Sequence, residues 1–415
     1  METVGLTAEY NPFHNGHRAQ LEAVRRRFGR RAGVLVCLSG PWTQRGVPAF
    51  LDKRVRAELA IEMGADLVIE LSQAFAAASA ERFARGAVDT MIGTGIIRHL
   101  VYGTDDADAI DRIRALAAHL ADESDALSHA LRERIAEGHG FANARERAVR
   151  DLYGDAMGDL LTRPDTILAV EYEKALITDD PEHRITTHAL PLVAPERHSA
   201  TALRARLERG VRSGDLTALI EDLGRAMPAP AAARWIAAVT RGDGFVTEEM
   251  TARYILSAPA LYDVERLRTI DGMDGGLAER VVRMLRDDPT AILSSGKDRP
   301  FDRWVRTVAS RSHPASRVRR ALLAAAFDRR AADPALTSAP PAMIRVLAFN
   351  RQGQHMLALM RRHAHLPVVQ NASDMRALAG DAKRQAMFDH AVQTVWNVHA
   401  DRRPKSEFEH TLRPM

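Results

Sequence analysis

Short apolar runs alternate with amphipathic stretches over the first half of the chain. Each run is followed by turn or polar residues, as in the buried strands of a parallel sheet, and the stretches between the runs repeat apolar residues at helical spacing. The runs span residues 4–8, 34–38, 67–71 and 100–103, with a further strand-like segment at 185–190. This alternation predicts an α/β fold with a doubly wound, Rossmann-like parallel sheet.

The pattern changes twice along the chain. Residues 105–160 have helical periodicity without strand signals, which predicts a helical insert in the sheet domain. Beyond residue 224, a short segment rich in Pro and Ala precedes a half that is helical in pattern. We therefore expect two domains, an α/β domain over 1–224 and a mainly α-helical domain over 225–415.

Composition narrows the class of protein. The chain has 415 residues, 46% hydrophobic and 27% charged, which suffices for two or three domains. Its single cysteine, Cys37, excludes an intramolecular disulfide and a cysteine zinc site, fits a reducing cytoplasm and is expected to pack in the core. No run approaches the roughly 18 apolar residues of a membrane span, and no signal-peptide pattern is present. We expect a cytoplasmic protein that acts away from membranes, and no protein partner is evident.

The candidate chemistry lies where the first apolar run ends. Asn11-Pro12 breaks the strand, and His14 and His17 then straddle Gly16 at the start of an amphipathic helix. The N–H groups and dipole of a helix N-terminus favour a phosphate group, and glycine lets a ligand approach the backbone. A lone histidine here is more often a cap. The pair with its glycine predicts a nucleotide site in which both imidazoles donate to a leaving pyrophosphate.

These residues also carry a family resemblance. His14-Asn15-Gly16-His17 resembles the HxGH signature of nucleotidyltransferases, and residues 9–17 are similar to one branch, the bacterial tRNA(Met) cytidine acetate ligases. Segments 39–49, 64–71 and 79–87 follow that family in order and spacing. The resemblance implies that ATP contacts Thr7, Ala8, Glu9, Tyr10, Asn11, Pro12, Phe13, His14, Asn15, Gly16, His17, Arg18, Ala19, Gln20 and Gly103.

Two of the residues in these blocks have simpler interpretations as well. Arg45 follows the second run, where its planar fork could bind a phosphate or a carboxylate, or where it could be a solvated turn residue. Gly103 follows the fourth run and could be a plain turn glycine. Within the family this glycine contacts ATP, so the resemblance assigns it to the nucleotide.

A later block supplies the third candidate catalytic residue. Ser199, Thr201 and Arg204 match the family's SATAIR signature. Ser and Thr can cap a helix, and an arginine one turn later can reach the β- and γ-phosphates. An ordinary capped helix would use the same residues. The resemblance makes His14, His17 and Arg204 the catalytic groups and adds Ser199 and Thr201 to the ATP site.

The chain departs from the family at two places. Residues 163–172 resemble RPNxILGxEY, but Asp165 replaces the asparagine and Ala169 replaces the glycine. The family uses that asparagine near the nucleotide, so the resemblance assigns Asp165 to the ATP site with an altered or lost contact, because a carboxylate cannot donate a hydrogen bond as an amide can. Capping of a helix by Asp165 or Thr166 is the alternative. The family's basic ATP-binding segment is also missing near residues 186–191, which leaves His188 or Arg184 as substitutes.

Positive charge concentrates in the second half. Residues 297–320 contain eight Lys and Arg against two Asp, a local excess of six in a chain of net charge +4. With Trp304 and His313 interleaved, the segment suits a phosphate backbone and an unstacked base, and a solvated helix face is the alternative. Segments 316–320 and 344–353 resemble the family's tRNA-binding domain. The residues we assign to tRNA are Arg303, Arg306, Arg311, Arg317, Arg319 and Arg320.

The resemblance implies a two-step reaction. Acetate attacks the α-phosphate of ATP, with Mg²⁺ arriving on the nucleotide, and the acetyl-adenylate then acylates the wobble cytidine of elongator tRNA(Met) to give N4-acetylcytidine. Two alternatives remain open. A nucleotidyltransferase acting on a small metabolite would share the HxGH site without needing a basic helical half. A tRNA-binding paralogue with weakened catalysis would account for Asp165, Ala169 and the missing basic segment.

Overall fold

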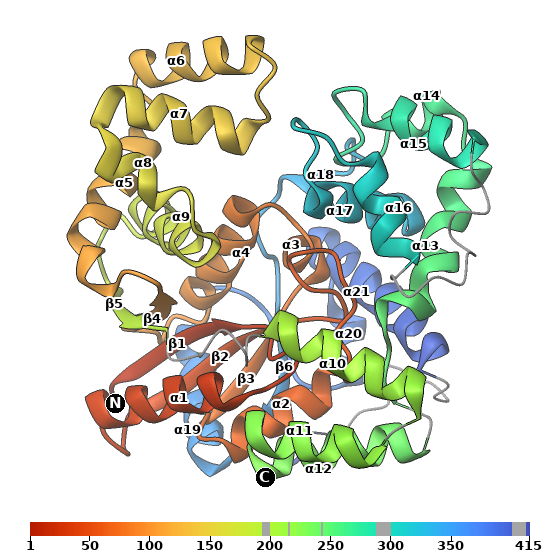
Figure 1. The fold of residues 1–415 in the computed structure, drawn as a ribbon. Helices are drawn as coiled ribbons and strands as arrows, with labels where there is room; N and C mark the ends of the chain where they lie inside the picture. Colours follow the sequence, from red (N-terminus) through yellow and green to blue (C-terminus); the bar gives the residue numbers. More distant parts are fainter. Residues whose placement is uncertain (193–199, 215, 242–243, 288–299, 401–411) are drawn as a thin grey trace.

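Seven strands form one sheet in the order β5-β4-β1-β2-β3-β6-β7 (Figure 1). The computed structural model describes residues 1–192, 200–214, 216–241, 244–287, 300–400 and 412–415. The strands are β1 (Thr3–Ala8), β2 (Gly33–Ser39), β3 (Leu67–Leu71), β4 (His99–Thr104), β5 (Thr186–Pro191), β6 (Ile344–Phe349) and β7 (Val368–Val369). β1 to β5 are mutually parallel, which confirms the predicted Rossmann-like sheet.

Helices connect and cover these strands. Those of the sheet region are α1 (Asn15–Phe28), α2 (Lys53–Glu62), α3 (Gln73–Ala76), α4 (Ala80–Gly93) and α9 (Pro164–Asp179). The predicted insert contains α5 (Ile110–Asp122), α6 (Asp125–Ala136), α7 (Phe141–Tyr153) and α8 (Asp155–Leu160). After β5 come α10 (Ala200–Ser213), α11 (Leu216–Ala226), α12 (Ala229–Arg241), α13 (Glu248–Leu261), α14 (Val264–Arg268), α15 (Leu277–Asp287), α16 (Pro300–Val308) and α17 (Ala315–Ala326). The last helices are α18 (Pro334–Thr337), α19 (Arg351–His363), α20 (Ala372–Ala377) and α21 (Gly380–His399).

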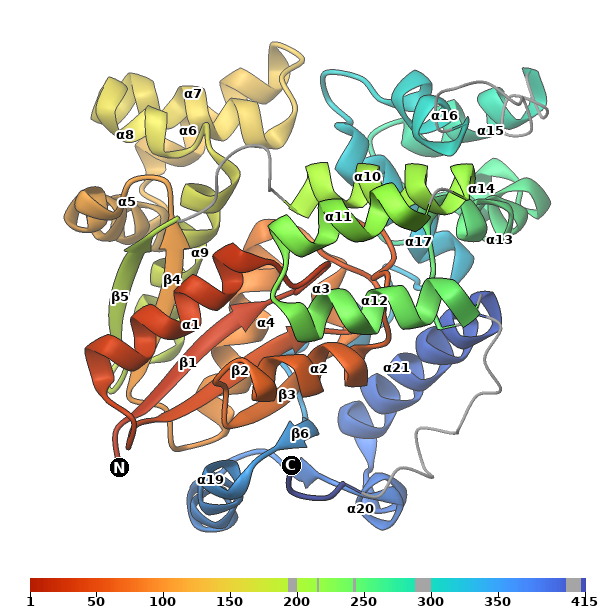
Figure 2. The same ribbon diagram turned by 60° about the horizontal axis from the view of Figure 1, so that its bottom comes forward.

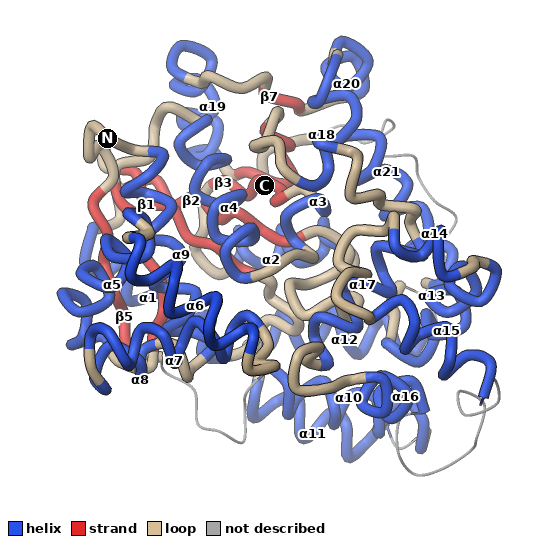
Figure 3. The backbone as a smooth tube through the Cα atoms, turned by 90° about the horizontal axis from the view of Figure 1, so that it is seen from above, coloured by secondary structure: helices blue, strands red, loops and turns tan. Residues whose placement is uncertain are grey.

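Two apolar cores sandwich the sheet. On one face, Val4, Leu6 and Val36 pack with α1, α2 and the helices α10 to α12. On the other face, Cys37 and Ile69 pack with α4, α9, α17 and α21. Cys37 is fully buried, as expected for a core residue. Figure 1 shows α5 to α8 and α13 to α17 as two helical groups on the same side of the sheet, and Figure 3 shows α13 to α17 gathered to one side of the strands.

The second half of the chain is not purely helical. Strand β6 pairs antiparallel with β3 (Figure 2), and β7 pairs parallel with β6. All six residues of β6 are buried, and Asn350 caps α19 while donating to Asp66 Oδ1 at 3.0 Å. A Cβ on Gly353 would lie 2.0 Å from Asp66 O, so only glycine fits there. Residues 344–349, which the sequence placed in the helical half, therefore extend the sheet.

Candidate active site

The loop after β1 is fastened by the asparagine of the motif. Asn11 Oδ1 accepts the Phe50 N–H at 2.9 Å, and Asn11 Nδ2 donates to Pro48 O at 3.2 Å. The buried rings of Tyr10 and Phe13 pack against His17, with centroids 4.9 and 5.5 Å from the imidazole. The apolar and amide residues between the strand and the helix thus form the scaffold that positions the histidines.

His14 and His17 cap the start of α1 reciprocally. His14 Nδ1 accepts the Gly16 N–H at 3.1 Å, and His17 Nδ1 accepts the His14 N–H at 3.3 Å. A neutral imidazole whose Nδ1 accepts a hydrogen bond carries its proton on Nε2. The rings stack with centroids 3.7 Å apart, so the cap presents two Nε2–H donors side by side.

Burial sets the charge state of His17. Burial, and then the neighbouring His14, lower the pKa of His17 well below its ordinary value. His17 is therefore neutral at neutral pH, with its tautomer fixed by the cap. Neutral N–H donors held in place in this way favour negative charge that develops in a transition state, because they need no reorganisation when that charge appears.

A cation reaches the same loop from α10. Arg204 Nη1 donates to Asn11 O at 2.8 Å, and Arg204 Nη2 donates to Thr201 Oγ1 at 3.0 Å. Burial lowers the pKa of Arg204, and the carboxylate of Glu9 opposes that shift. The structure thus brings Arg204 and Thr201 to the histidine loop, far apart as they are in sequence. Ser199 lies outside the described residues.

Sequence reasoning missed a buried arginine that ties the site loops together. Arg56 donates to the carbonyl groups of Glu9, Ser39, Gly40 and Leu51, at 2.6, 3.1, 2.7 and 3.0 Å. Burial lowers the pKa of Arg56 to about 10, which leaves it charged at neutral pH. The carbonyl groups after β1 and β2 are therefore held by one guanidinium. The sequence carries no local signal for this role, because Arg56 is one of several basic residues on α2.

Asp165 lies in the first turn of α9 and does not cap it. The N-cap is Arg163, which makes no side-chain cap bond, so the capping predicted for Asp165 or Thr166 is wrong. Thr166 is buried, with its Oγ1 3.2 Å from Thr104 Oγ1. Burial and the charge of Asp105 raise the pKa of Asp165, and the exposed Arg45 acts in the opposite direction.

Arg45 also acts on Arg204, whose pKa it lowers. Asp165 and Arg45 therefore lie within electrostatic range of each other, and Arg45 lies within range of Arg204. The loop that carries Arg45 is itself tied to the histidine motif, because Glu9 Oε1 accepts the Gln44 N–H at 2.7 Å.

Gly103 and His188 are two further residues of the expected ATP site. A Cβ on Gly103 would lie 2.6 Å from Leu192 Cδ2 and 3.6 Å from Gln20 Nε2, so the glycine makes room for a side chain after β5. His188 lies on β5 with Nδ1 3.0 Å from Arg27 Nη2, in the last turn of α1. The histidine motif lies at the first turn of that helix, so the structure does not bring His188 to it.

Arg184 does not join the motif either. It lies before β5, paired with Asp180 at 3.4 Å. The remaining residues of the implied ATP site need no long-range contact to come together. Residues Thr7 to Gln20 form the end of β1, the loop and the first turns of α1, so the sequence itself holds them at one place.

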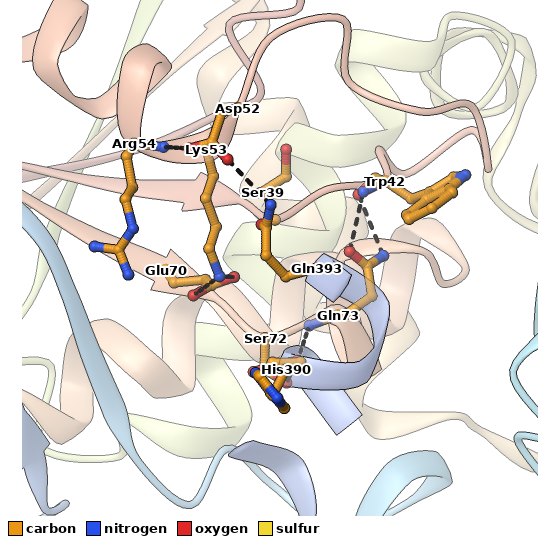
Figure 4. A network of polar contacts seen from close by, with 12 residues as sticks. Ser39, Trp42, Asp52, Lys53, Arg54, Glu70, Ser72, Gln73, His390 and Gln393 are labelled. Atoms are coloured by element: carbon orange, nitrogen blue, oxygen red, sulfur yellow. Dashed lines mark hydrogen bonds and ion pairs between the residues drawn. The ribbon is translucent and has the colours of Figure 1, made fainter. Parts of the chain in front are cut away.

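A buried polar network joins α21 to the sheet behind these loops (Figure 4). Lys53 Nζ and Glu70 Oε1 form an ion pair at 2.7 Å, with both side chains almost fully buried. Asp389 Oδ1 accepts the Ser72 hydroxyl at 2.9 Å and the Gln73 N–H at 2.7 Å. Burial, and then the charge of Glu70, raise the pKa of Asp389 to about 8.

The same network reaches the helix of Arg56. Gln393 Nε2 on α21 donates to Asp52 Oδ2 at 3.0 Å, and Asp52 Oδ1 caps α2 by accepting the Arg54 N–H at 2.8 Å. The last long helix therefore supports, through Asp52, the helix whose arginine fastens the site loops. Sequence reasoning could not find this link, because its partners are separated by most of the chain.

The basic segment divides into exposed and interior arginines. Arg303, Arg306 and Arg311 are exposed, and Arg306 pairs with Asp302 at 2.6 Å with 74% of its side chain exposed. Arg317 pairs with Asp274 at 2.7 Å. The assignment of these side chains to a tRNA phosphate backbone stays a prediction.

Arg319, Arg320 and the aromatic residues of this segment lie in the interior. Arg319 is 12% exposed and pairs with Glu248 at 2.6 Å, and Arg320 Nη1 lies 3.4 Å from Gln44 O. Trp304 and His313 are buried, so the expectation that they stack on an unpaired base is wrong. Trp304 packs in the apolar core, and His313 Nδ1 lies 3.1 Å from the hydroxyl oxygens of Ser310 and Ser312.

The described part of the chain shows neither a membrane span nor a metal centre. None of its helices is both long and apolar enough to cross a bilayer. It also contains no group of three or more His, Cys, Asp or Glu side chains that could hold a metal ion.

Comparisons with known proteins show the family and the fold of the chain. The HIGH Nucleotidyl Transferase family model matches residues 1–409. The chain is 31% identical to the tRNA(Met) cytidine acetate ligase of Syntrophotalea carbinolica, covering 90% of this chain and 85% of the relative. It is 30% identical to the protein of that name from Thermotoga petrophila, covering 88% and 86%. The crystal structure of Thermotoga maritima TmcAL bound with alpha-thio ATP superposes with a TM-score of 0.86 at 28% identity, covering 100% of both chains.

Proposed function

We propose that this protein acetylates the wobble cytidine of elongator tRNA(Met), because the chain belongs to the tRNA(Met) cytidine acetate ligase family of HIGH nucleotidyltransferases. In the first step a carboxylate oxygen of acetate bonds to the α-phosphorus of ATP, and the bond to the bridging oxygen of pyrophosphate breaks. In the second step the N4 amine of cytidine attacks the acetyl carbon, AMP leaves and the amine loses a proton. Such a tRNA reaction takes place in the cytoplasm.

The reciprocal cap of His14 and His17 is the observation that carries this proposal. Two Nε2–H donors at the N-terminus of α1 suit the phosphate oxygens of ATP, and Arg204 beside them suits the departing pyrophosphate. Catalysis then comes from positioning and from electrostatic stabilisation, without a covalent enzyme intermediate. The described side chains offer no ligand cluster for Mg²⁺, so the ion would enter with the phosphates of ATP.

We assign acetate to hydroxyl groups near the carboxyl ends of β1 and β2. Thr7 Oγ1 and Ser39 Oγ are buried, and Ser39 Oγ makes no hydrogen bond to a described residue. The Tyr172 hydroxyl on α9 lies beside Thr7 and within electrostatic range of Glu9 and Asp165. Neutral hydroxyl donors can orient a carboxylate without cancelling the negative charge that makes it a nucleophile.

For tRNA, we assign the exposed arginines of the helical group. Arg303 and Arg306 lie on α16 and Arg311 lies in the turn that follows it. This turn meets the helical insert, because a Cβ on Gly140 would lie 2.8 Å from Arg311 O. Positive side chains at this junction suit a phosphate backbone that spans both helical groups.

The test is a reaction with ATP, labelled acetate and an elongator tRNA(Met) transcript, following pyrophosphate release and label on cytidine. We expect label on the tRNA, and a loss of about 100-fold or more in rate for Arg204→Ala and His17→Gln. The matched control is His129→Gln, an exposed histidine on α6 paired with Glu133. Unchanged rates in Arg204→Ala would contradict the assigned role.

The same assay separates the two alternatives. Pyrophosphate release with a small phosphorylated metabolite, and none with acetate, would favour a metabolite nucleotidyltransferase. Binding of tRNA without pyrophosphate release or label would favour a paralogue with weakened catalysis. The like charges of Asp105 and Asp165 at the site are the observation that motivates that second candidate, because they oppose a nucleotide phosphate.

A further inference from the structure

A small cavity is lined by residues of α3, α17 and α21 and of the segment that follows α17. Its volume is about 10 Å³, and its lining combines the apolar side chains of Phe327 and Phe388 with three polar residues, Gln73, Arg320 and Arg329. A space of this size holds one water molecule or one monatomic ion. Phosphate, sulfate and carboxylate groups are too large for it.

One side chain that lines the cavity, Arg329, is a buried cation with unused hydrogen-bonding capacity. Arg329 is 6% exposed, and its Nη2 pairs with Asp271 Oδ2 at 2.6 Å. Its Nε–H is buried and makes no hydrogen bond to any described residue. A buried guanidinium N–H without an acceptor is costly, so an acceptor at this position would be strongly favoured.

Positive charge exceeds negative charge around the same point. Arg320 lines the cavity, and burial followed by the charges of Arg329 and Arg317 lowers its pKa to about 10. Arg82 on α4 has a buried Nη2 without a hydrogen-bond partner among the described residues, and burial and Arg329 lower its pKa to about 10. Asp271 is the carboxylate that offsets both of these arginines.

The remaining polar group cannot supply the missing charge. Gln73 is engaged at both ends of its amide, accepting the Trp42 N–H at 3.1 Å and donating to Trp42 O at 3.2 Å. A water molecule could accept the Arg329 Nε–H but would leave the charge excess uncompensated. We propose that the cavity binds a monatomic anion of the halide class, such as chloride, between the guanidinium groups of Arg320 and Arg329.

Such an ion would join the sheet region to the helical group. Arg320 lies on α17 directly against the site loop, because its backbone N would be 3.0 Å from a Cβ on Gly46. α3 carries Gln73 and follows β3 directly. Binding to the folded state alone stabilises it as ligand concentration rises. The anion therefore has a structural role, with no part in the transfer of acetate.

Two measurements on the full chain test the proposal. Crystals soaked in sodium bromide should show an anomalous difference peak between Arg320 and Arg329, whereas a cavity without such a peak would overturn the proposal. Thermal unfolding in sodium chloride should occur about 2 °C or more above unfolding in sodium gluconate at the same ionic strength. Equal unfolding temperatures in the two salts would also overturn it.

Two variants should change this halide effect in opposite directions. Arg329→Gln should lose most of the chloride-dependent rise in unfolding temperature. The rise that remains in this variant measures the general effect of the salt. Asp271→Asn removes the carboxylate that competes with the anion for Arg329. The Asp271 side chain is 33% exposed, and its replacement should enlarge the chloride-dependent rise in unfolding temperature. The second variant keeps the test decisive if Arg329→Gln does not fold. A smaller chloride effect in Asp271→Asn would contradict the proposal.

Discussion

The imidazoles of His14 and His17 stack with centroids 3.7 Å apart, and each accepts a backbone N–H through Nδ1. These two bonds have two effects: they cap α1, and in a neutral imidazole they place the proton on Nε2. The stability of the helix start and the chemistry of the site are therefore coupled through the same two side chains.

That coupling predicts how stability depends on pH at His17. Burial and His14 lower the pKa of His17 in the folded state. Its contribution to the free energy of unfolding is therefore complete above the unfolded pKa of about 6.5 and is lost as the pH falls toward the folded pKa. We expect the Tm of the wild type to fall more between pH 7 and pH 5 than the Tm of His17→Gln, which keeps an acceptor but does not titrate. Thermal unfolding measures both, with His129→Gln as the exposed control. Parallel curves for all three proteins would contradict the assigned pKa direction.

Asp389 predicts the opposite pH dependence. The pKa of Asp389 in the folded state is about 8, above the ordinary value for an aspartate. Its contribution to the free energy of unfolding is therefore complete below about pH 4 and is lost as the pH rises toward 8. Asp389→Asn keeps the Oδ1 acceptor for Ser72 and Gln73 and cannot ionise. We expect this variant to unfold at a higher temperature than the wild type at pH 9 and to differ little at pH 5. Asp381→Asn, on the exposed surface of the same helix, is the control and should change neither value. A variant that is less stable than the wild type at pH 9 would refute the prediction.

The loop after β2 that carries Gln44, Arg45 and Gly46 should be sensitive to a single methyl group at Gly46. This glycine has φ +74°, and an added Cβ would lie 3.0 Å from Arg319 Cβ and from Arg320 N. Gly29 has φ +81° with nothing within 4 Å of the added Cβ, so Gly29→Ala carries the conformational cost alone. We expect Gly29→Ala to lose about 1 kcal/mol and Gly46→Ala about 1 to 3 kcal/mol more, with a raised KM for ATP only in Gly46→Ala. Denaturant unfolding measures the loss of stability, and steady-state kinetics measure the KM for ATP. Equal losses of stability in Gly29→Ala and Gly46→Ala would show that α17 moves to accommodate the methyl group.

The acetate assignment predicts a selective kinetic effect. Tyr172→Phe removes a hydroxyl beside Thr7 without changing the packing of the ring against Tyr102, whose centroid is 5.9 Å away. We expect the KM for acetate to rise about tenfold, as for a lost hydrogen bond, while the KM for ATP stays within a factor of two. Tyr153→Phe, on α7 of the helical insert and stacked on His119, is the matched control. A rise in the KM for ATP alone would move Tyr172 to the nucleotide.

Local sequence patterns predicted the parts of the site that are continuous in the chain. Val4 to Ala8, the break at Pro12 and the helix start at Asn15 are neighbours, so periodicity and turn residues suffice to place them. Arg204 was found only through a motif, because nothing in its own helix indicates that it donates to Asn11 O. The prediction for His188 did not match the structure, because the register of β5 puts this residue beside Arg27.

Contacts across long stretches of sequence account for what the sequence did not predict. Strand β6 has the apolar pattern of a buried strand, but helical segments surround it and its partner β3 lies far away in the chain. Arg56 and Asp389 look like ordinary charged residues on helices. Their buried environments exist only after the sheet, α2 and α21 have come together, and periodicity within one helix contains no information about that.

The two kinds of arginine in the basic segment predict different outcomes for tRNA binding. Arg306 is 74% exposed on α16, whereas Arg319 is 12% exposed and pairs with Glu248 and Asp302. We expect Arg306→Gln to weaken tRNA binding and to reduce the slope of log affinity against log salt by about one, with an unchanged Tm. Arg319→Gln should instead lower the stability by about 3 kcal/mol, because it leaves the buried carboxylate of Glu248 without its partner. Binding titrations at several salt concentrations and thermal unfolding distinguish the two. An unchanged salt slope in Arg306→Gln would remove α16 from the proposed tRNA surface.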